Sequence, residues 1–182
     1  MSNGRVPSER ARAAAAAAPS SWVYEIDPWF DPDGAVPPHA IIGAWRSGAD
    51  GMIAGAFTPN DHYQPSPAVR GFRAPLTDLE DALQRLVTGY GDLERFTTIF
   101  AVAPLWVLDE PGHRGEIKVE MSSEGRVVRA FTSPDLLPDG VDTPSVAIPG
   151  GVLIDRLPVD SRIAINPGTA PTIVFPFGSS AS

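Results

Sequence analysis

The histidines and serines of this sequence lack the spacing that metal binding or nucleophilic catalysis requires. His39, His62 and His113 lie in three separate segments, and no two of them have the helical His-x-x-x-His spacing of a metal pair. No serine stands in a Gly-x-Ser-x-Gly elbow. Ser66 between two prolines and Ser133 before a proline are typical of turn and cap residues. We therefore predict no catalytic residue and no metal site.

Composition excludes cysteine chemistry, and the motif pattern argues against the common cofactor-binding loops. The sequence has no cysteine, so it has no thiol nucleophile, disulfide or thiolate ligand. Its one lysine, Lys118, lacks the glycine-rich run that wraps phosphates. A dinucleotide fingerprint starting at Gly89 and Gly91 needs a third glycine at a position that Glu94 occupies. The sequence predicts no bound cofactor.

A cluster of acids raises the question of calcium binding. Asp27, Asp31 and Asp33 precede Gly34, but an EF-hand register on that glycine places apolar residues at the first and last ligand positions. Neighbouring prolines favour a surface turn instead. Other carboxylate pairs cannot be assigned from spacing, because such pairs meet only in the fold.

Aromatic residues near loops are the remaining candidates for function. Trp29 and Phe30 follow Pro28 beside a predicted loop, where an exposed aromatic can anchor a partner protein. Core packing is the alternative interpretation. The candidate partner-binding residues are Trp29, Phe30, Trp45 and Tyr63.

Length and charge limit the classes of partner. The chain has 182 residues and a mass of 19.3 kDa, which suits one domain or one domain with a small appendage. With 22 acids against 14 bases the net charge is −8, which disfavours nucleic acid and anionic membranes. No apolar run approaches the ~20 residues of a membrane span, so no membrane insertion is expected.

The first 21 residues differ from the rest in composition. They hold three arginines against one acid, followed by the alanine run 13–18. That run is too short and too weakly hydrophobic for a secretory signal, whose apolar region has ~7–15 residues. Residues 1–21 are therefore predicted as a basic tail or short helix, bounded by Pro7 and Pro19, and a cytoplasmic location is expected.

Residues 22–75 are predicted as a β-rich segment that ends in a proline-rich connection. Aromatic or aliphatic residues occupy alternate positions from Trp22 to Ile26, which is typical of a half-buried strand. Two apolar runs, 40–45 and 52–57, flank turn-forming residues and indicate a hairpin. The stretch 63–67 suits neither a central strand nor a helix interior, so the connection begins there.

Residues 76–177 are predicted to form an α+β domain. Thr77 and Glu80 have the spacing of a capping box, Gly89 can end that helix, and Asp92 can cap a second one. The elements expected after them are a strand at 105–108, a hairpin of 117–121 with 127–131, a one-turn helix after Ser133, a strand at 146–148, a helix at 152–157, and strands around 163–165 and 173–175.

The fold class predicted for the whole chain is α+β. Strands and helices mix without strict alternation, so we expect a mixed or antiparallel sheet with a few short helices. The small β-rich segment precedes this sheet. Residues 178–182 are predicted to be a disordered tail.

Five short motifs follow one another along the chain: Trp45-Arg46-Ser47, Asn60 with Tyr63-Gln64-Pro65-Ser66-Pro67, Thr88-Gly89-Tyr90-Gly91, Phe131-Thr132-Ser133-Pro134, and Asn166-Pro167. Their order and spacing resemble an actinobacterial family of type VII secretion system-associated proteins. The second half is similar to the SseB-like domain of that family, a small α+β module. The resemblance runs from about Pro7 to Phe175. It implies an accessory role in secretion and carries no catalytic motif.

The hypothesis that follows is a cytoplasmic, non-enzymatic accessory protein that acts by protein–protein contact. Its partners would be components of a type VII secretion system or the substrates it secretes, bound by an apolar patch rimmed by acids. One alternative is an immunity or inhibitor protein whose acidic surface blocks a basic toxin. Another is a hydrolase in which His39 or His62 meets Asp61 in a closed pocket.

Overall fold

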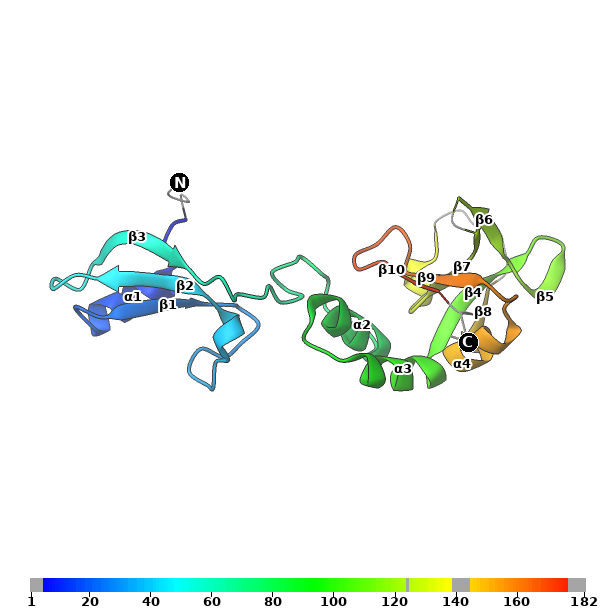
Figure 1. Ribbon diagram of the computed structural model, residues 1–182, viewed down its shortest axis with the longest axis horizontal. Helices are drawn as coiled ribbons and strands as arrows, with labels where there is room; N and C mark the ends of the chain where they lie inside the picture. Colours follow the sequence, from blue (N-terminus) through cyan, green and yellow to red (C-terminus); the bar gives the residue numbers. More distant parts are fainter. Residues whose placement is uncertain (1–4, 124, 139–144, 177–182) are drawn as a thin grey trace. The chain divides into compact units, whose positions relative to one another are not determined.

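The chain forms two compact units that differ in architecture. The computed structural model describes residues 5–123, 125–138 and 145–176. The described residues up to Gly71 form the first unit, and those from Phe72 onward form the second (Figure 1). Helices and mixed sheets combine in the chain, which confirms the predicted α+β class. The expected tail at 178–182 lies outside the described residues.

The first unit is a three-stranded antiparallel sheet with one helix. The strand order is β1-β2-β3, so β2 is central and the predicted hairpin is confirmed. The elements are α1 (Glu9–Ala17), β1 (Trp22–Ile26), the 3₁₀ turn η1 (Pro38–Ala40), β2 (Ile41–Ser47) and β3 (Ile53–Pro59).

Helix α1 is held on this sheet by small side chains. The Ser8 hydroxyl caps the helix by accepting a hydrogen bond from the Ala11 amide. An alanine-rich helix of this length is marginal in water by itself. Ala11 and Ala15 are buried with Val23 and Trp45, so packing on the sheet stabilises the helix.

Strand β1 buries the face that carries its acid. Val23 and Glu25 are buried, as is Asp27 just beyond the strand, whereas Trp22 and Tyr24 are 47% and 55% exposed. The half-buried strand is confirmed. Its aromatic face is the outer one, which is the reverse of the usual arrangement in which the apolar side faces the core.

The second unit is built on a seven-stranded mixed sheet. The main strand order is β10-β9-β7-β4-β5, with β6 beside β7 and β8 beside β4; β7 and β9 are parallel, and every other pair is antiparallel. The elements are α2 (Asp78–Thr88), α3 (Leu93–Val102), β4 (Pro104–Glu110), β5 (His113–Ile117), β6 (Glu120–Ser122), β7 (Gly125–Phe131), η2 (Pro134–Leu136), β8 (Ser145–Pro149), α4 (Gly150–Arg156), β9 (Ser161–Ile165) and β10 (Ile173–Pro176).

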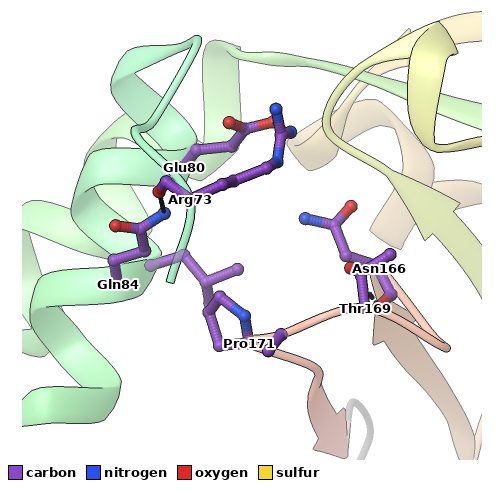
Figure 2. Close-up of a pocket in the computed structure, with 8 residues that line it drawn as sticks. Arg73, Glu80, Gln84, Asn166, Thr169 and Pro171 are labelled. Carbon is purple, nitrogen blue, oxygen red and sulfur yellow. Dashed lines mark hydrogen bonds and ion pairs between the residues drawn. The ribbon is translucent and has the colours of Figure 1, made fainter. Parts of the chain in front are cut away.

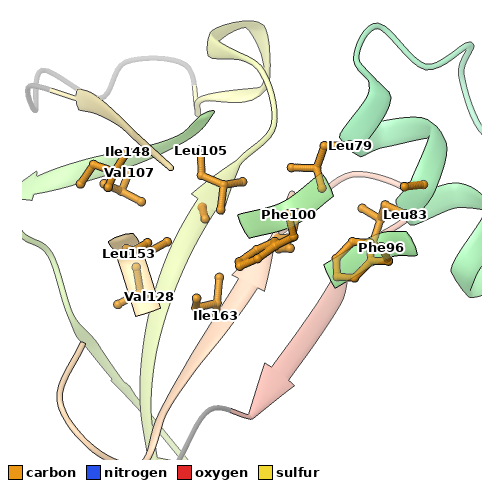
Figure 3. Close-up of a cluster of buried hydrophobic side chains, with 13 residues drawn as sticks. Leu79, Leu83, Phe96, Phe100, Leu105, Val107, Val128, Ile148, Leu153 and Ile163 are labelled. Carbon is orange, nitrogen blue, oxygen red and sulfur yellow. The ribbon is translucent and has the colours of Figure 1, made fainter. Parts of the chain in front are cut away.

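One hydrophobic core joins the helices of this unit to its sheet. Figure 3 shows side chains of α2 and α3 on one side and side chains of β4, β7 and β9 on the other. Full burial of one such side chain contributes about 1.5–3 kcal/mol. The labelled residues are Leu79, Leu83, Phe96, Phe100, Leu105, Val107, Val128, Ile148, Leu153 and Ile163.

The helix boundaries follow the predicted caps. The Thr77 hydroxyl accepts from the Glu80 amide, the Asp92 carboxylate accepts from the Arg95 amide, and Gly89 ends α2 with φ of 76°. In a capping box the glutamate side chain accepts a hydrogen bond from the amide of the capping residue. Here the Glu80 carboxylate accepts from the Leu76 amide instead.

The predicted hairpin of 117–121 with 127–131 is only partly correct. Strand β6 pairs with β7 from Glu120 onward, whereas His113–Ile117 form a separate strand, β5, on β4. Strand β5 is almost wholly exposed and contains Gly115, so it has no apolar alternation that could reveal it.

None of the described helices is long and apolar enough to cross a membrane.

Gly43 in β2 leaves no room for a side chain, and we predict that Gly43→Ala destabilises the first unit. A Cβ there would overlap the Phe57 ring and the Thr58 carbonyl. The expected loss is about 1–3 kcal/mol in the free energy of unfolding, measured by tryptophan fluorescence in urea. Gly34→Ala is the matched control, because its Cβ would make ordinary contact at 3.4 Å from the Asp31 carbonyl. Equal stability of the two variants would contradict the prediction.

Candidate functional site

Asp27 is a fully buried acid that accepts four hydrogen bonds. Its Oδ1 accepts from the Ser66 hydroxyl at 2.6 Å and the Trp29 amide at 3.0 Å. Its Oδ2 accepts from the Tyr63 hydroxyl at 2.8 Å and the Ser66 amide at 3.0 Å. Because Ser66 is 39 residues away in sequence, these bonds fasten the proline-rich loop to the end of β1.

These hydrogen bonds keep the Asp27 carboxylate charged. Burial opposes ionisation and by itself raises the pKa. The bond from the Ser66 hydroxyl, the backbone bonds from Trp29 and Ser66, and the bond from Tyr63 outweigh burial, so the pKa of Asp27 lies below its usual value. At neutral pH the loop is therefore held by a buried anion.

Glu25 holds the helix and the central strand in the same way. Its Oε1 accepts from the Ser8 amide at 2.9 Å and from the Trp45 indole at 3.1 Å. The first bond reaches the capping residue of α1, and the second reaches β2. Glu25 and Asp27 thus connect β1 to α1, to β2 and to the loop at 63–67.

A groove of about 310 Å³ lies along this part of the unit. Its lining includes Tyr24, Phe30 and the ring of Pro32, together with Glu25. Arg10 also lines the groove and pairs with Asp33 at 2.8 Å, and both side chains are exposed. Ser8 and the buried carboxylate of Asp27 line it too. The groove therefore combines aromatic, aliphatic, hydroxyl and charged groups, which is the usual make-up of a binding site.

The predicted partner-binding residues have different places in this unit. Phe30 lines the groove and meets Trp29 edge to face at 5.8 Å, and both side chains are half-buried. The Tyr63 hydroxyl donates a hydrogen bond to Asp27. Trp45 requires a correction, because it is only 4% exposed and its indole is bonded inside the core. Its strand position places it under α1, out of reach of a partner.

The residues considered for other chemistry lie in solvent-facing turns. Asp61 and His62 are exposed, and His39 is half-buried beside Phe30, so these groups are not enclosed in a pocket. Asp31 accepts from the Asp33 amide within a surface turn. Within the described ranges, no group of three or more His, Cys, Asp or Glu residues could hold a metal ion.

The second unit contains a buried polar cluster around Glu80 (Figure 2). Glu80 accepts from Arg73 at 2.7 Å, from the Leu76 amide at 2.8 Å and from the Thr132 hydroxyl at 2.7 Å. Asn166 accepts from the Thr132 amide at 2.9 Å and donates to the Thr132 hydroxyl at 3.0 Å. The cluster ties α2 to the ends of β7 and β9.

This cluster is structural rather than a binding site. Figure 2 shows Arg73, Glu80 and Gln84 on the helix side facing Asn166 and Thr169. The space between them is about 10 Å³, which accommodates at most one water molecule. Thr132 and Asn166 belong to two of the sequence motifs. The hydrogen bonds between them give those motifs a common role, which is to hold the ends of β7 and β9 together.

Sequence reasoning missed Glu25 and the role of Ser66. Ser66 was expected only as a turn residue, yet its side chain is fully buried against Asp27. One signal could have revealed that the acids Glu25 and Asp27 are buried. Acids at alternate positions of a strand, with aromatics between them, indicate that one kind of side chain must occupy an unusual face. The partner of each acid lies too far along the chain to be deduced.

Comparison with known proteins identifies no relative. No protein-family model matches the sequence, no curated protein matches it, and no solved structure matches the fold.

We predict that Asp27→Asn destabilises the first unit by about 2 kcal/mol or more at neutral pH, because an amide cannot accept from all four donors. The folded pKa of Asp27 is lowered, so its contribution is complete above the unfolded value of about 3.9 and is lost as the pH falls through the folded value. The difference from the wild type should therefore shrink below about pH 4, as measured by urea unfolding at several pH values.

Asp61→Asn is the matched control, because Asp61 is exposed and its substitution should leave stability unchanged at neutral pH. A difference between Asp27→Asn and the wild type that stays constant down to acidic pH would contradict the role assigned to the carboxylate.

Proposed function

We propose that this protein is a non-enzymatic accessory protein that acts by binding other proteins. The observation that carries the proposal is the outer edge of β1, an edge strand bordered by exposed aromatics and by the groove. Edge strands present unpaired backbone groups, and partners often bind by adding a strand to them.

The hydrogen-bond register defines which groups this edge offers. The Ser47 amide donates to the Ser21 carbonyl, and the Asp27 amide donates to the Ala40 carbonyl. Backbone groups alternate in direction along an antiparallel strand, so the odd-numbered residues of β1 bond to β2. The amides and carbonyls of Trp22 and Tyr24 therefore point away from the sheet and are positioned to pair with an added strand.

Side chains around this edge supply apolar contact area. Trp22 and Tyr24 stand on the outer face of β1, and the Arg46 guanidinium lies 5.4 Å from the Trp22 ring centroid. Tyr24 and Phe30 also line the groove. Aromatic side chains with few rotatable bonds are the usual anchors of protein interfaces, so an extended peptide segment fits this surface.

The proposed partners are components of a type VII secretion system or its secreted substrates, met in the cytoplasm. This assignment is supported by the five ordered sequence motifs that resemble secretion-associated proteins. The hydrogen bonds that join Thr132 to Asn166 give two of those motifs a physical reason to occur together.

We predict that Tyr24→Pro abolishes capture of these partners while the first unit stays folded. Proline removes an amide that points away from β2, which edge strands tolerate. Tyr24→Ala keeps the amide and removes only the ring, so it should weaken capture less. The measurement is affinity capture from the native host, with mass spectrometry of the bound proteins and thermal unfolding of each variant.

A matched acidic protein provides the background for this experiment. The proposed function is wrong if the wild type captures no secretion component or substrate above that background. The assignment of the edge is wrong if the wild type and Tyr24→Pro capture the same partners equally.

A further inference from the structure

The groove of about 310 Å³ in the first unit follows the outer edge of β1. Four consecutive residues, 24–27, line it. Side chains of a strand alternate between the two faces of a sheet, so a lining by consecutive residues places the groove along the edge of the strand. The start of α1 lines it as well, and so do Phe30 and Pro32 from the loop after β1. A strand added to this edge would therefore occupy the groove.

Glu25 brings an open carboxylate oxygen to this groove. The residue is only 7% exposed, and its Oε1 accepts both of its hydrogen bonds, from the Ser8 amide and the Trp45 indole. No hydrogen bond reaches Oε2 from the described residues, and this oxygen is not fully enclosed. Glu25 and the Ser8 that bonds to it both line the groove, so we place the open oxygen there. Both contacts of the carboxyl group are N–H donors, which is what a carboxylate requires.

The charges around the groove favour a cation. Asp27 lines it too, and its hydrogen bonds hold its pKa below the usual value, so it is an anion at neutral pH. Arg10 is the base of the lining, and Asp33 offsets its charge by pairing with it at 2.8 Å. Among the described residues no ion pair joins Arg10 to Glu25. The groove thus has acceptor capacity and negative charge that the chain itself does not neutralise.

We propose that this groove binds a lysine side chain of the partner's added strand, with its ammonium on Oε2 of Glu25 and its alkyl stem against Tyr24 and Phe30. An ammonium has three donors and no acceptor, which matches an oxygen that lacks donors. Aromatic rings attract a cation and cover the alkyl stem. Arginine fits less well, because its fork suits a carboxylate with both oxygens open. This inference rests on the proposed function, since it names a residue of the partner that binds at the β1 edge.

The experiment is an NMR titration of the full chain with Nα-acetyl-lysine N-methylamide, followed by its norleucine and arginine analogues. The lysine probe should shift the amides of Tyr24 and Phe30. The norleucine probe keeps the alkyl chain and lacks the ammonium, so it should bind at least about tenfold more weakly. The arginine probe should also bind more weakly than lysine, because a single open oxygen cannot accept two parallel bonds.

Glu25→Gln isolates the open oxygen. Its amide oxygen can still accept from the Ser8 amide and the Trp45 indole, while an NH₂ group takes the place of Oε2. This variant should fold, which thermal unfolding checks, and should bind the lysine probe at least about tenfold more weakly. Asp31→Asn is the matched control. It removes one charge at an exposed acid outside the lining, so the affinity should change by less than about threefold.

Equal affinity of the wild type for the lysine and norleucine probes overturns the inference, and this comparison does not depend on the fold of any variant. Unchanged affinity in Glu25→Gln, an arginine probe that binds at least as tightly as lysine, or no binding of any probe also overturns it. Affinity capture from the native host separates this inference from the proposed function. Capture by the wild type that is undiminished in Glu25→Gln contradicts the lysine contact alone, whereas no capture by the wild type contradicts the proposed function.

Discussion

Saturation of buried carboxylates is the constraint on which both units of this protein depend. A carboxylate removed from water must receive hydrogen bonds in the protein, or it raises the free energy of the folded state by several kcal/mol. Asp27 receives four such bonds, and Glu80 receives bonds from a guanidinium, an amide and a hydroxyl. Each acid therefore holds a segment of the chain that lies outside the helices and strands.

The proline-rich loop of the first unit illustrates this effect. Proline has no amide hydrogen, so a segment such as 63–67 cannot join a sheet ladder. Its Tyr63 hydroxyl and its Ser66 amide and hydroxyl bond to Asp27 instead. Because Asp27 and Glu25 occupy the inner face of β1, Trp22 and Tyr24 are left on the outer face. The exposed aromatic edge is thus a consequence of where the acids are buried.

In the second unit the same constraint produces the hydrogen bonds that join helix α2 to the sheet. The Thr132 hydroxyl donates to Glu80, and Asn166 bonds to both the amide and the hydroxyl of Thr132. These contacts span more than thirty residues of sequence in each case. Asp109 departs from this pattern, because its Oδ1 is buried without a hydrogen-bond partner among the described residues.

Local signals in the sequence were sufficient to predict much of the fold. Helices α2 and α3 begin directly after their capping residues, Thr77 and Asp92, because a cap acts over three or four residues. The hairpin of β2 and β3 follows from turn formers between two apolar runs. Strand β5 was missed because it is almost wholly exposed and has no apolar alternation.

The candidate site was harder to predict, because its contacts are distant in sequence. Phe30, a candidate because of its place beside a loop, lines the groove, whereas Trp45, another candidate partner-binding residue, is in the core. Nothing local distinguishes an indole that faces a helix from one that faces solvent. The link from Ser66 to Asp27 spans 39 residues, and the lack of a partner for Asp109 is visible only in the folded chain.

Amide hydrogen exchange tests the central role of these carboxylates most directly. The amides of Ser66 and Leu76 lie outside regular secondary structure, yet they donate to Asp27 and Glu80. Both should exchange far more slowly than the amide of the exposed residue Ala74 under native conditions. Exchange of Ser66 and Leu76 as rapid as that of Ala74 would show that the buried acids do not hold these segments, and would contradict the account.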